Sequence, residues 1–134
     1  MKDYTRLVVY VREELGGGDE YDDYRPRLDT VRQIARLLPD ARAKIVTATN
    51  SPECQREVAR FVRILKHLDG WSTTIIEDDP GIRQRFAITQ IPTFILRSPE
   101  TGREIGRIVR GPTSGRLEDD LLTIAEQNPS HILA

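Results

Sequence analysis

A proline stands at the entrance to an apolar stretch of the sequence, and this position restricts how the chain can fold. Residues 86–96 read Phe-Ala-Ile-Thr-Gln-Ile-Pro-Thr-Phe-Ile-Leu, so Pro92 separates an apolar approach from an apolar exit. Proline cannot donate a hydrogen bond within a sheet, and only X-Pro peptide bonds adopt the cis form at low cost. We therefore predict that Ile91-Pro92 forms a tight, cis-compatible entry into a buried strand.

The composition predicts one globular domain. The sequence has 134 residues, of which 38% are hydrophobic and 31% are charged, and its net charge is -1. This length is sufficient for a single core, so we expect one domain over residues 1–134. The nearly balanced charge gives no reason to expect binding to nucleic acid or to an anionic membrane. No apolar run approaches the length of a membrane span and the first residues lack a signal-peptide core, so we expect a cytoplasmic protein.

Cysteine and histidine are too few for a disulfide or a dedicated metal site. Cys54 is the only cysteine, which excludes an internal disulfide. The two histidines, His67 and His131, are far apart in the sequence, so no zinc site is expected. We accordingly predict no metal and no other cofactor.

The N-terminal segment allows two interpretations. Residues 7–11, Leu-Val-Val-Tyr-Val, are β-branched and aromatic, which favours a first strand. Helical spacing is the alternative, because apolar side chains also recur at Tyr4, Leu7, Val8, Val11 and Leu15. We predict the strand. After it, residues 13–23 contain three glycines, six acidic residues and no basic residue, which predicts a solvated flexible loop; a docking patch for a basic partner is the alternative.

The rest of the chain alternates between helical and extended patterns. A helix after Pro26 has Leu28, Val31, Ala35 and Leu38 on one face. The later elements are a central strand (43–49), a long helix (52–68), a strand (71–77), a short helix (80–86), the strand after Pro92, its hairpin partner (103–110) and a last helix with Thr113 or Ser114 as its cap. Residues 128–134 are expected to form a loose tail. The predicted order is β-α-β-α-β-α-β-β-α, an α/β fold with a mixed sheet and helices on both faces.

The sequence from Pro80 to Thr93, Pro-Gly-Ile-Arg-Gln-Arg-Phe-Ala-Ile-Thr-Gln-Ile-Pro-Thr, resembles the thioredoxin family, in which a short helix leads to the family's cis-proline. The predicted order of elements over residues 6–126 is also similar to that family. The resemblance implies the thioredoxin fold, a central mixed β-sheet flanked by helices.

The same resemblance implies a catalytic site that has lost its nucleophile. The family's Cys-x-x-Cys pair lies where a strand turns into the long helix, and the corresponding residues here are Ser51-Pro52-Glu53-Cys54. The first cysteine of such a pair attacks a disulfide as a thiolate stabilised by the helix N-terminus, and the second resolves the mixed disulfide. A serine hydroxyl without an adjacent base is a poor nucleophile. Many thioredoxins also carry an aromatic residue and a buried acid where this chain has Asn50 and Ile45.

Each candidate site residue also has a purely structural interpretation. Ser51 followed by Pro52 is a favoured helix start, which predicts a capping role for the serine. Cys54 shares a helix face with Val58, which predicts a small core residue; alternatively, it is a lone reactive thiol near the helix N-terminus. In the thioredoxin family the residue before the cis-proline pairs with an extended substrate. The resemblance thus implies substrate binding at Ile91 and Pro92, whereas a turn with a packed side chain is the structural alternative.

Three functions are compatible with the sequence. The first is monothiol redox chemistry at Cys54, with protein or glutathione thiols and disulfides as partners. The second is a non-catalytic binding module that holds a peptide partner at the Ile91-Pro92 groove. The KaiB family of clock proteins is a thioredoxin-like precedent for a non-redox role, and its Asn-Thr-Pro helix start is similar to Asn50-Ser51-Pro52. The third is ordinary dithiol chemistry, if Ser51 replaces a natural cysteine.

Overall fold

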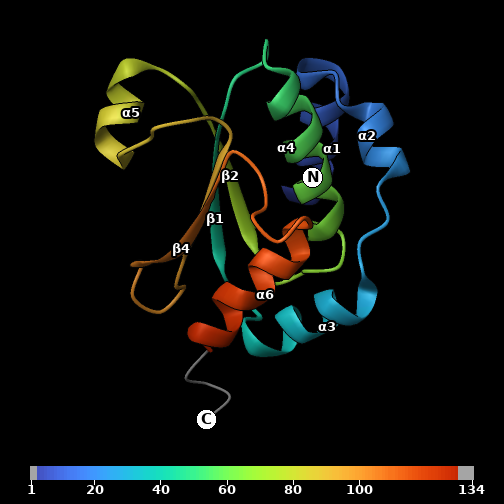
Figure 1. The fold of residues 1–134 in the computed structure, drawn as a ribbon, viewed down its shortest axis with the longest axis vertical. Coiled ribbons are helices and arrows are strands. Elements are labelled where there is room, and N and C mark those ends of the chain that lie inside the picture. Colours follow the sequence, from blue (N-terminus) through green and yellow to red (C-terminus); the bar gives the residue numbers. More distant parts are fainter. Residues whose placement is uncertain (1–2, 130–134) are drawn as a thin grey trace.

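The structure is a computed structural model that describes residues 3–129 (Figure 1). Its elements in chain order are α1 (Asp3–Val9), the π-helix η1 (Tyr10–Leu15), α2 (Gly18–Asp23), α3 (Leu28–Leu37), β1 (Arg42–Thr47), α4 (Pro52–Leu65), β2 (Ser72–Glu77), α5 (Pro80–Phe86), β3 (Thr93–Arg97), β4 (Glu104–Val109) and α6 (Leu117–Gln127).

The four strands form one mixed sheet in the order β2-β1-β3-β4. β1 runs parallel to β2 and antiparallel to β3, and β3 and β4 form an antiparallel hairpin. Ile45 of β1 pairs with Ile75 of β2 and with Phe94 of β3. β1 is therefore a central strand, as its apolar sequence predicts.

The two faces of the sheet bury unequal cores. Ile45 and Phe94 belong to the larger core, which also contains the apolar sides of α3, α4 and α6 and of the N-terminal helices. The ring of Phe94 stacks on that of Phe61 of α4 with centroids 4.6 Å apart. On the other face a small cluster of Val46, Ile88 and Ile95 lies against α5, which stands apart from the other helices in Figure 1. Helices thus cover both faces, which confirms the predicted α/β class.

The predicted elements from α3 onward are present, with corrections at their ends. Leu28 is predicted on the buried face of α3 but is 44% exposed. It is the first residue of the helix, and the buried residues of α3 begin at Val31. Neither Thr113 nor Ser114 caps α6, which begins at Leu117. Asn128 is held by hydrogen bonds from its Nδ2 to the carbonyl oxygens of Ile105 and Ile124, so the tail is not loose there; residues 130–134 lie outside the described residues.

The predicted first strand is wrong, because residues 7–11 are helical. α1 continues directly into η1, and the buried side chains are Leu7, Val11 and Leu15, which recur every four residues. A strand would place Val9 on the same face as Leu7 and Val11, but Val9 is 42% exposed. The helix prevails because it packs Leu7, Val11 and Leu15 on α4.

The prediction of a flexible loop over residues 13–23 is also wrong. η1 ends at Leu15 and is followed by its C-cap Gly16, whose φ of 75° is left-handed, and α2 begins at Gly18. Tyr21 of α2 is buried, and Glu20 accepts a hydrogen bond from Arg60 of α4 at 3.3 Å. Glu20 of this acidic segment therefore helps to hold α2 against α4.

We predict that Gly17 sets how closely this N-terminal segment approaches α4. A Cβ atom on Gly17 would lie 2.6 Å from the carbonyl oxygen of Gln55, so Gly17→Ala should lower the free energy of unfolding by about 2 kcal/mol. Gly18→Ala is the matched control, because its Cβ would meet only the flexible side chain of Arg12, at 3.3 Å. Urea denaturation of both variants measures the difference, and equal stabilities would contradict a close approach at Gly17.

A fully buried carboxylate joins α6 to the segment that precedes α3. Glu118 accepts hydrogen bonds from the Tyr24 hydroxyl, from the Arg27 backbone N–H at 2.7 Å and from Arg116 Nε at 3.1 Å. Burial disfavours the charged form, but these hydrogen bonds outweigh it and lower the pKa of Glu118 below its ordinary value of 4.5. Both oxygens of this buried carboxylate therefore accept hydrogen bonds.

We expect Glu118 to make the protein acid-sensitive. Because its folded-state pKa is lowered, its contribution is complete above pH 4.5 and is lost as the pH falls through the folded-state pKa. Glu118→Gln should cost roughly 3 kcal/mol at pH 7 and flatten the loss of stability below pH 4.5. Chemical denaturation across pH measures both effects. The exposed Glu126, on the same helix, provides the control Glu126→Gln, and an equal acid response in the two variants would contradict the assignment.

Candidate functional site

In the loop that precedes β3, the backbone of Ile91 lies beside a cis peptide bond. The Ile91–Pro92 peptide bond is cis. On one side of it, the Thr93 hydroxyl donates to the carbonyl oxygen of Gln90 at 2.6 Å; on the other, the Arg110 N–H donates to the carbonyl oxygen of Pro92 at 2.6 Å. Between these anchored carbonyls, the N–H and C=O of Ile91 make no hydrogen bond with any residue from 3 to 129. A fixed, unpaired backbone unit of this kind can pair with an extended peptide.

The start of α4 is capped by Ser51 and buries Cys54. The Ser51 Oγ accepts a hydrogen bond from the Cys54 N–H at 3.2 Å, and Pro52 is the first helical residue. This is the predicted cap, in which a serine satisfies one of the free N–H groups of the first turn. Cys54 is 0% exposed, in the same core as Val58 and Phe61. The thiol therefore occupies a core position and is not at the surface.

The two other positions at which the sequence departs from many thioredoxins carry no chemistry in this structure. Asn50 is exposed in the turn before the cap, and Ile45 is fully buried in β1. Since Ile45 is apolar, it cannot carry a proton for a neighbouring thiol.

Arg110 connects the loop of residues 87–92, here called the proline loop, to α4. It has a φ of 72°, in the left-handed region that few non-glycine residues adopt, and it follows directly after β4. Its Nη2 donates to Glu53 Oε1 at 2.9 Å, and its Nε donates to Oε2 of the same carboxylate. These hydrogen bonds lower the pKa of Glu53. The turn at Arg110 therefore provides both a backbone anchor for Pro92 and an ion pair with the first turn of α4.

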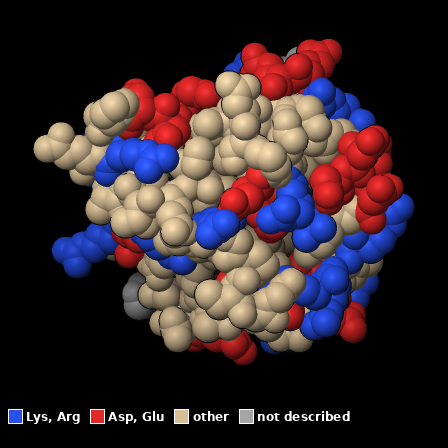
Figure 2. Space-filling view, turned by 45° about the horizontal axis from the view of Figure 1, so that its top comes forward, with Lys and Arg blue, Asp and Glu red and all other residues tan. Residues whose placement is uncertain are grey.

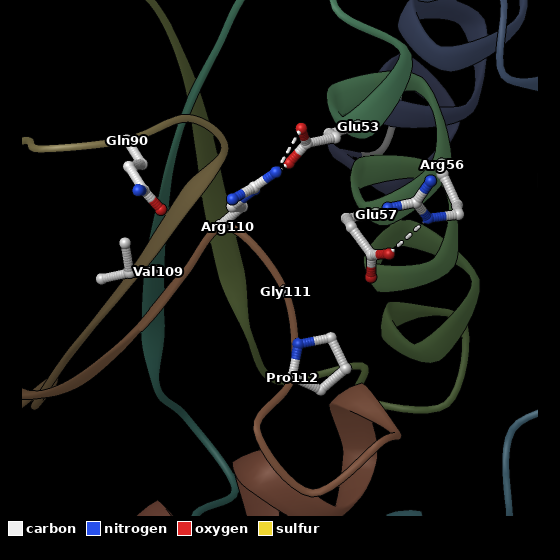
Figure 3. Close-up of a pocket in the computed structure, with 8 residues that line it drawn as sticks. All are labelled: Glu53, Arg56, Glu57, Gln90, Val109, Arg110, Gly111 and Pro112. Carbon is white, nitrogen blue, oxygen red and sulfur yellow. Dashed lines mark hydrogen bonds and ion pairs between the residues drawn. The ribbon is translucent and has the colours of Figure 1, made fainter.

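A cleft of about 570 Å³ lies between α4 and the segment that leaves β4 (Figure 3). The residues that line it are Glu53, Arg56, Glu57, Gln90, Val109, Arg110, Gly111 and Pro112. Arg56 and Arg110 each pair with a glutamate, so the charges of the lining are balanced. Basic and acidic side chains are also interspersed over the face seen in Figure 2, which provides no field of one sign.

Glu57 is the residue of this cleft that the sequence analysis missed. It is 4% exposed although it is charged, and its Oε2 accepts a hydrogen bond from Arg56 Nε at 2.7 Å. Its Oε1 is buried and has no hydrogen-bond partner among the described residues. The signal was its spacing: Glu57 follows Cys54 by three residues and precedes Phe61 by four, which places it on the buried side of α4.

Of the predicted site residues, Ile91 and Pro92 lie in the loop before β3. Ser51 caps α4, and Cys54 lies in the first turn of that helix. The pair of Glu53 with Arg110 joins these two parts. Within residues 3–129, no three His, Cys, Asp or Glu side chains are grouped so as to hold a metal ion. The helices of the same residues include none that is long and apolar enough to cross a membrane.

Solved structures with a similar arrangement include thioredoxins. A protein of unknown function from Pseudomonas aeruginosa has a TM-score of 0.65 and 19% identity, over 95% of this chain and 86% of its own. Mitochondrial thioredoxin 3 from Saccharomyces cerevisiae has a TM-score of 0.51 and 20% identity, over 76% of this chain and 96% of its own. A thioredoxin from Fasciola hepatica has a TM-score of 0.52 and 14% identity, over 72% of this chain and 91% of its own.

The chain therefore has a thioredoxin-like fold. No protein-family profile matches its sequence, and no curated protein sequence does. Because one fold hosts many activities, function has to be argued from the site itself.

The capping role of Ser51 leads to a stability prediction. Ser51→Ala should lower the free energy of unfolding by about 1 kcal/mol, because the Cys54 N–H loses its acceptor. Ser51→Asp retains an acceptor at the cap and is the matched control, with an expected change of less than about 0.5 kcal/mol. Thermal or urea unfolding compares the two. A Ser51→Ala variant as stable as Ser51→Asp would show that the serine is not needed as a cap.

Proposed function

We propose that this protein is a non-catalytic binding module that holds an extended peptide at the Ile91-Pro92 edge. The observation that carries the proposal is that the N–H and C=O of Ile91 have no partner among residues 3–129 and lie between two carbonyl groups that are themselves hydrogen-bonded. A peptide in extended conformation pairs with such a unit through its own backbone, which gives affinity without demanding one sequence. The partner is therefore a protein segment that is disordered, or that can detach from the rest of its protein, so that its backbone groups are available for pairing.

The neighbouring cleft supports this proposal by offering room for side chains. Alternate side chains of a bound strand point to opposite sides, so one of them would face the cleft beside Gln90 and Val109. Val109 is 38% exposed and provides an apolar surface there. The backbone edge would supply affinity and the cleft would supply selectivity.

Monothiol chemistry at Cys54 is less well supported. A thiol must be reachable to attack a disulfide, and Cys54 is 0% exposed. Ser51 in turn has its Oγ engaged as a cap and no described base hydrogen-bonded to it. We therefore assign no redox step to the chain.

The binding proposal can be tested with the capped heptapeptide Thr-Val-Thr-Arg-Thr-Val-Thr, whose composition favours the extended state. Titration into isotope-labelled protein should shift the amide resonance of Ile91. N-methylation of the peptide at every second residue removes the N–H groups of one edge only. Methylation of the pairing edge should weaken binding by roughly tenfold, whereas methylation of the other edge should change it little. Equal effects of the two would contradict backbone pairing.

Cys54→Ala provides the control that separates binding from redox chemistry. We expect this variant to bind the peptide with unchanged affinity, because the thiol lies in the core. The folded wild-type protein should also gain no mass on incubation with oxidised glutathione. A mass increase of one glutathione, absent from Cys54→Ala, would instead support the monothiol hypothesis.

A further inference from the structure

The least compensated group of the described cleft is the Glu57 carboxylate. Its side chain is 6% exposed, whereas that of its partner Arg56 is 44% exposed. A buried carboxylate that is paired with a half-exposed cation through one hydrogen bond retains part of its desolvation cost. By contrast, the Glu53 carboxylate at the rim of the same cleft has both oxygens hydrogen-bonded by Arg110.

Helix geometry explains why Arg56 leaves this carboxylate half-satisfied. Adjacent residues of a helix point in different directions and do not face each other. Arg56 accordingly reaches Glu57 with one N–H, from Nε to Oε2, and leaves Oε1 without a partner among residues 3–129 (Figure 3). If an external guanidinium displaced Arg56 and also reached the buried Oε1, it would form a bidentate pair with Glu57, and such pairs are stronger than a single hydrogen bond.

The remaining walls of the cleft fit a long cationic side chain. Val109 provides an apolar surface for the methylene groups, which arginine and lysine commonly lay along apolar neighbours. Gly111 lies against the carboxylate without a side chain: a Cβ there would be 3.7 Å from Glu57 Cδ and 3.9 Å from Oε1. Arg56 is half-exposed, so it can swing into solvent once a ligand replaces its hydrogen bond to Glu57 Oε2.

We propose that Glu57 is a specificity-determining residue, which binds an arginine or lysine side chain of the peptide in place of Arg56. This inference rests on the proposed binding of an extended peptide at Ile91. Arg56 then acts as an internal substitute for the ligand, keeping Glu57 compensated in the free protein. An acidic ligand is disfavoured, because both arginines of the cleft already pair with carboxylates.

The test varies only the central residue of the heptapeptide Thr-Val-Thr-Xaa-Thr-Val-Thr. Arginine is compared with citrulline, its uncharged isostere, with norleucine and with glutamate. We expect the arginine peptide to bind about tenfold more tightly than the citrulline and norleucine peptides, and the glutamate peptide to bind most weakly. The arginine peptide alone should also shift the side-chain carboxyl resonance of Glu57.

Two variants distinguish the roles of the neighbouring residues. Glu57→Gln should bring the arginine and norleucine peptides to within about twofold of each other. Arg56→Met removes the guanidinium that competes for Glu57 and keeps an unbranched apolar side chain, so it should preserve or increase the preference for arginine. Glu126→Gln is the matched control and should leave the preference unchanged. Thermal unfolding confirms that each variant is folded, and the comparison of peptides on the wild-type protein needs no variant.

The outcomes separate this inference from the function on which it rests. If all four peptides shift the Ile91 amide with equal affinity, the peptide edge is supported and the role of Glu57 is overturned. Tighter binding of glutamate, lost in Arg56→Met, would overturn it in favour of an anion site. If no peptide shifts the Ile91 amide, the proposed function fails and the inference fails with it.

Discussion

The hydrogen bond from the Arg110 N–H to the carbonyl oxygen of Pro92 is the contact on which the arrangement of the site depends. At 2.6 Å it joins the residue after β4 to the residue before β3. The left-handed backbone of Arg110 also turns its guanidinium toward Glu53 on α4. Arg110 thus anchors Pro92, closes the hairpin and spans the cleft. Ile91, next to this anchor, has a backbone N–H and C=O without a partner among the described residues.

The two buried glutamates among residues 3–129 differ in their number of hydrogen-bond partners, which is why we propose a binding role for Glu57 and not for Glu118. Glu118 receives hydrogen bonds at both oxygens, from side chains and from a backbone N–H, so its burial strengthens the contact between distant parts of the chain. Glu57 receives one hydrogen bond, from the adjacent residue of its own helix. Binding of an external hydrogen-bond donor would offset the desolvation cost of the unpaired Glu57 Oε1.

The sequence allowed most of the fold to be predicted, because its patterns are local. Alternating helical and extended segments from Pro26 onward, and the resemblance at Ile91-Pro92-Thr93, pointed to a mixed sheet with helices on both faces. The start of α4 followed from Ser51-Pro52. The first strand was wrong because Leu7, Val11 and Leu15 share one face in a helix and in a strand alike. Only packing against α4, which buries these residues and leaves Val9 exposed, selects the helix.

By itself the sequence determined the class of fold, the cap of α4 and the absence of an attacking cysteine beside it, because each follows from residue type at a fixed spacing. Tertiary structure alone decided that Cys54 lies in the core, that the acidic segment is helical and that Glu57 borders a cleft. Those properties depend on which surfaces meet. Segments far apart in the chain, such as α4 and the residues after β4, create the burial and the empty hydrogen-bonding position that no local pattern encodes.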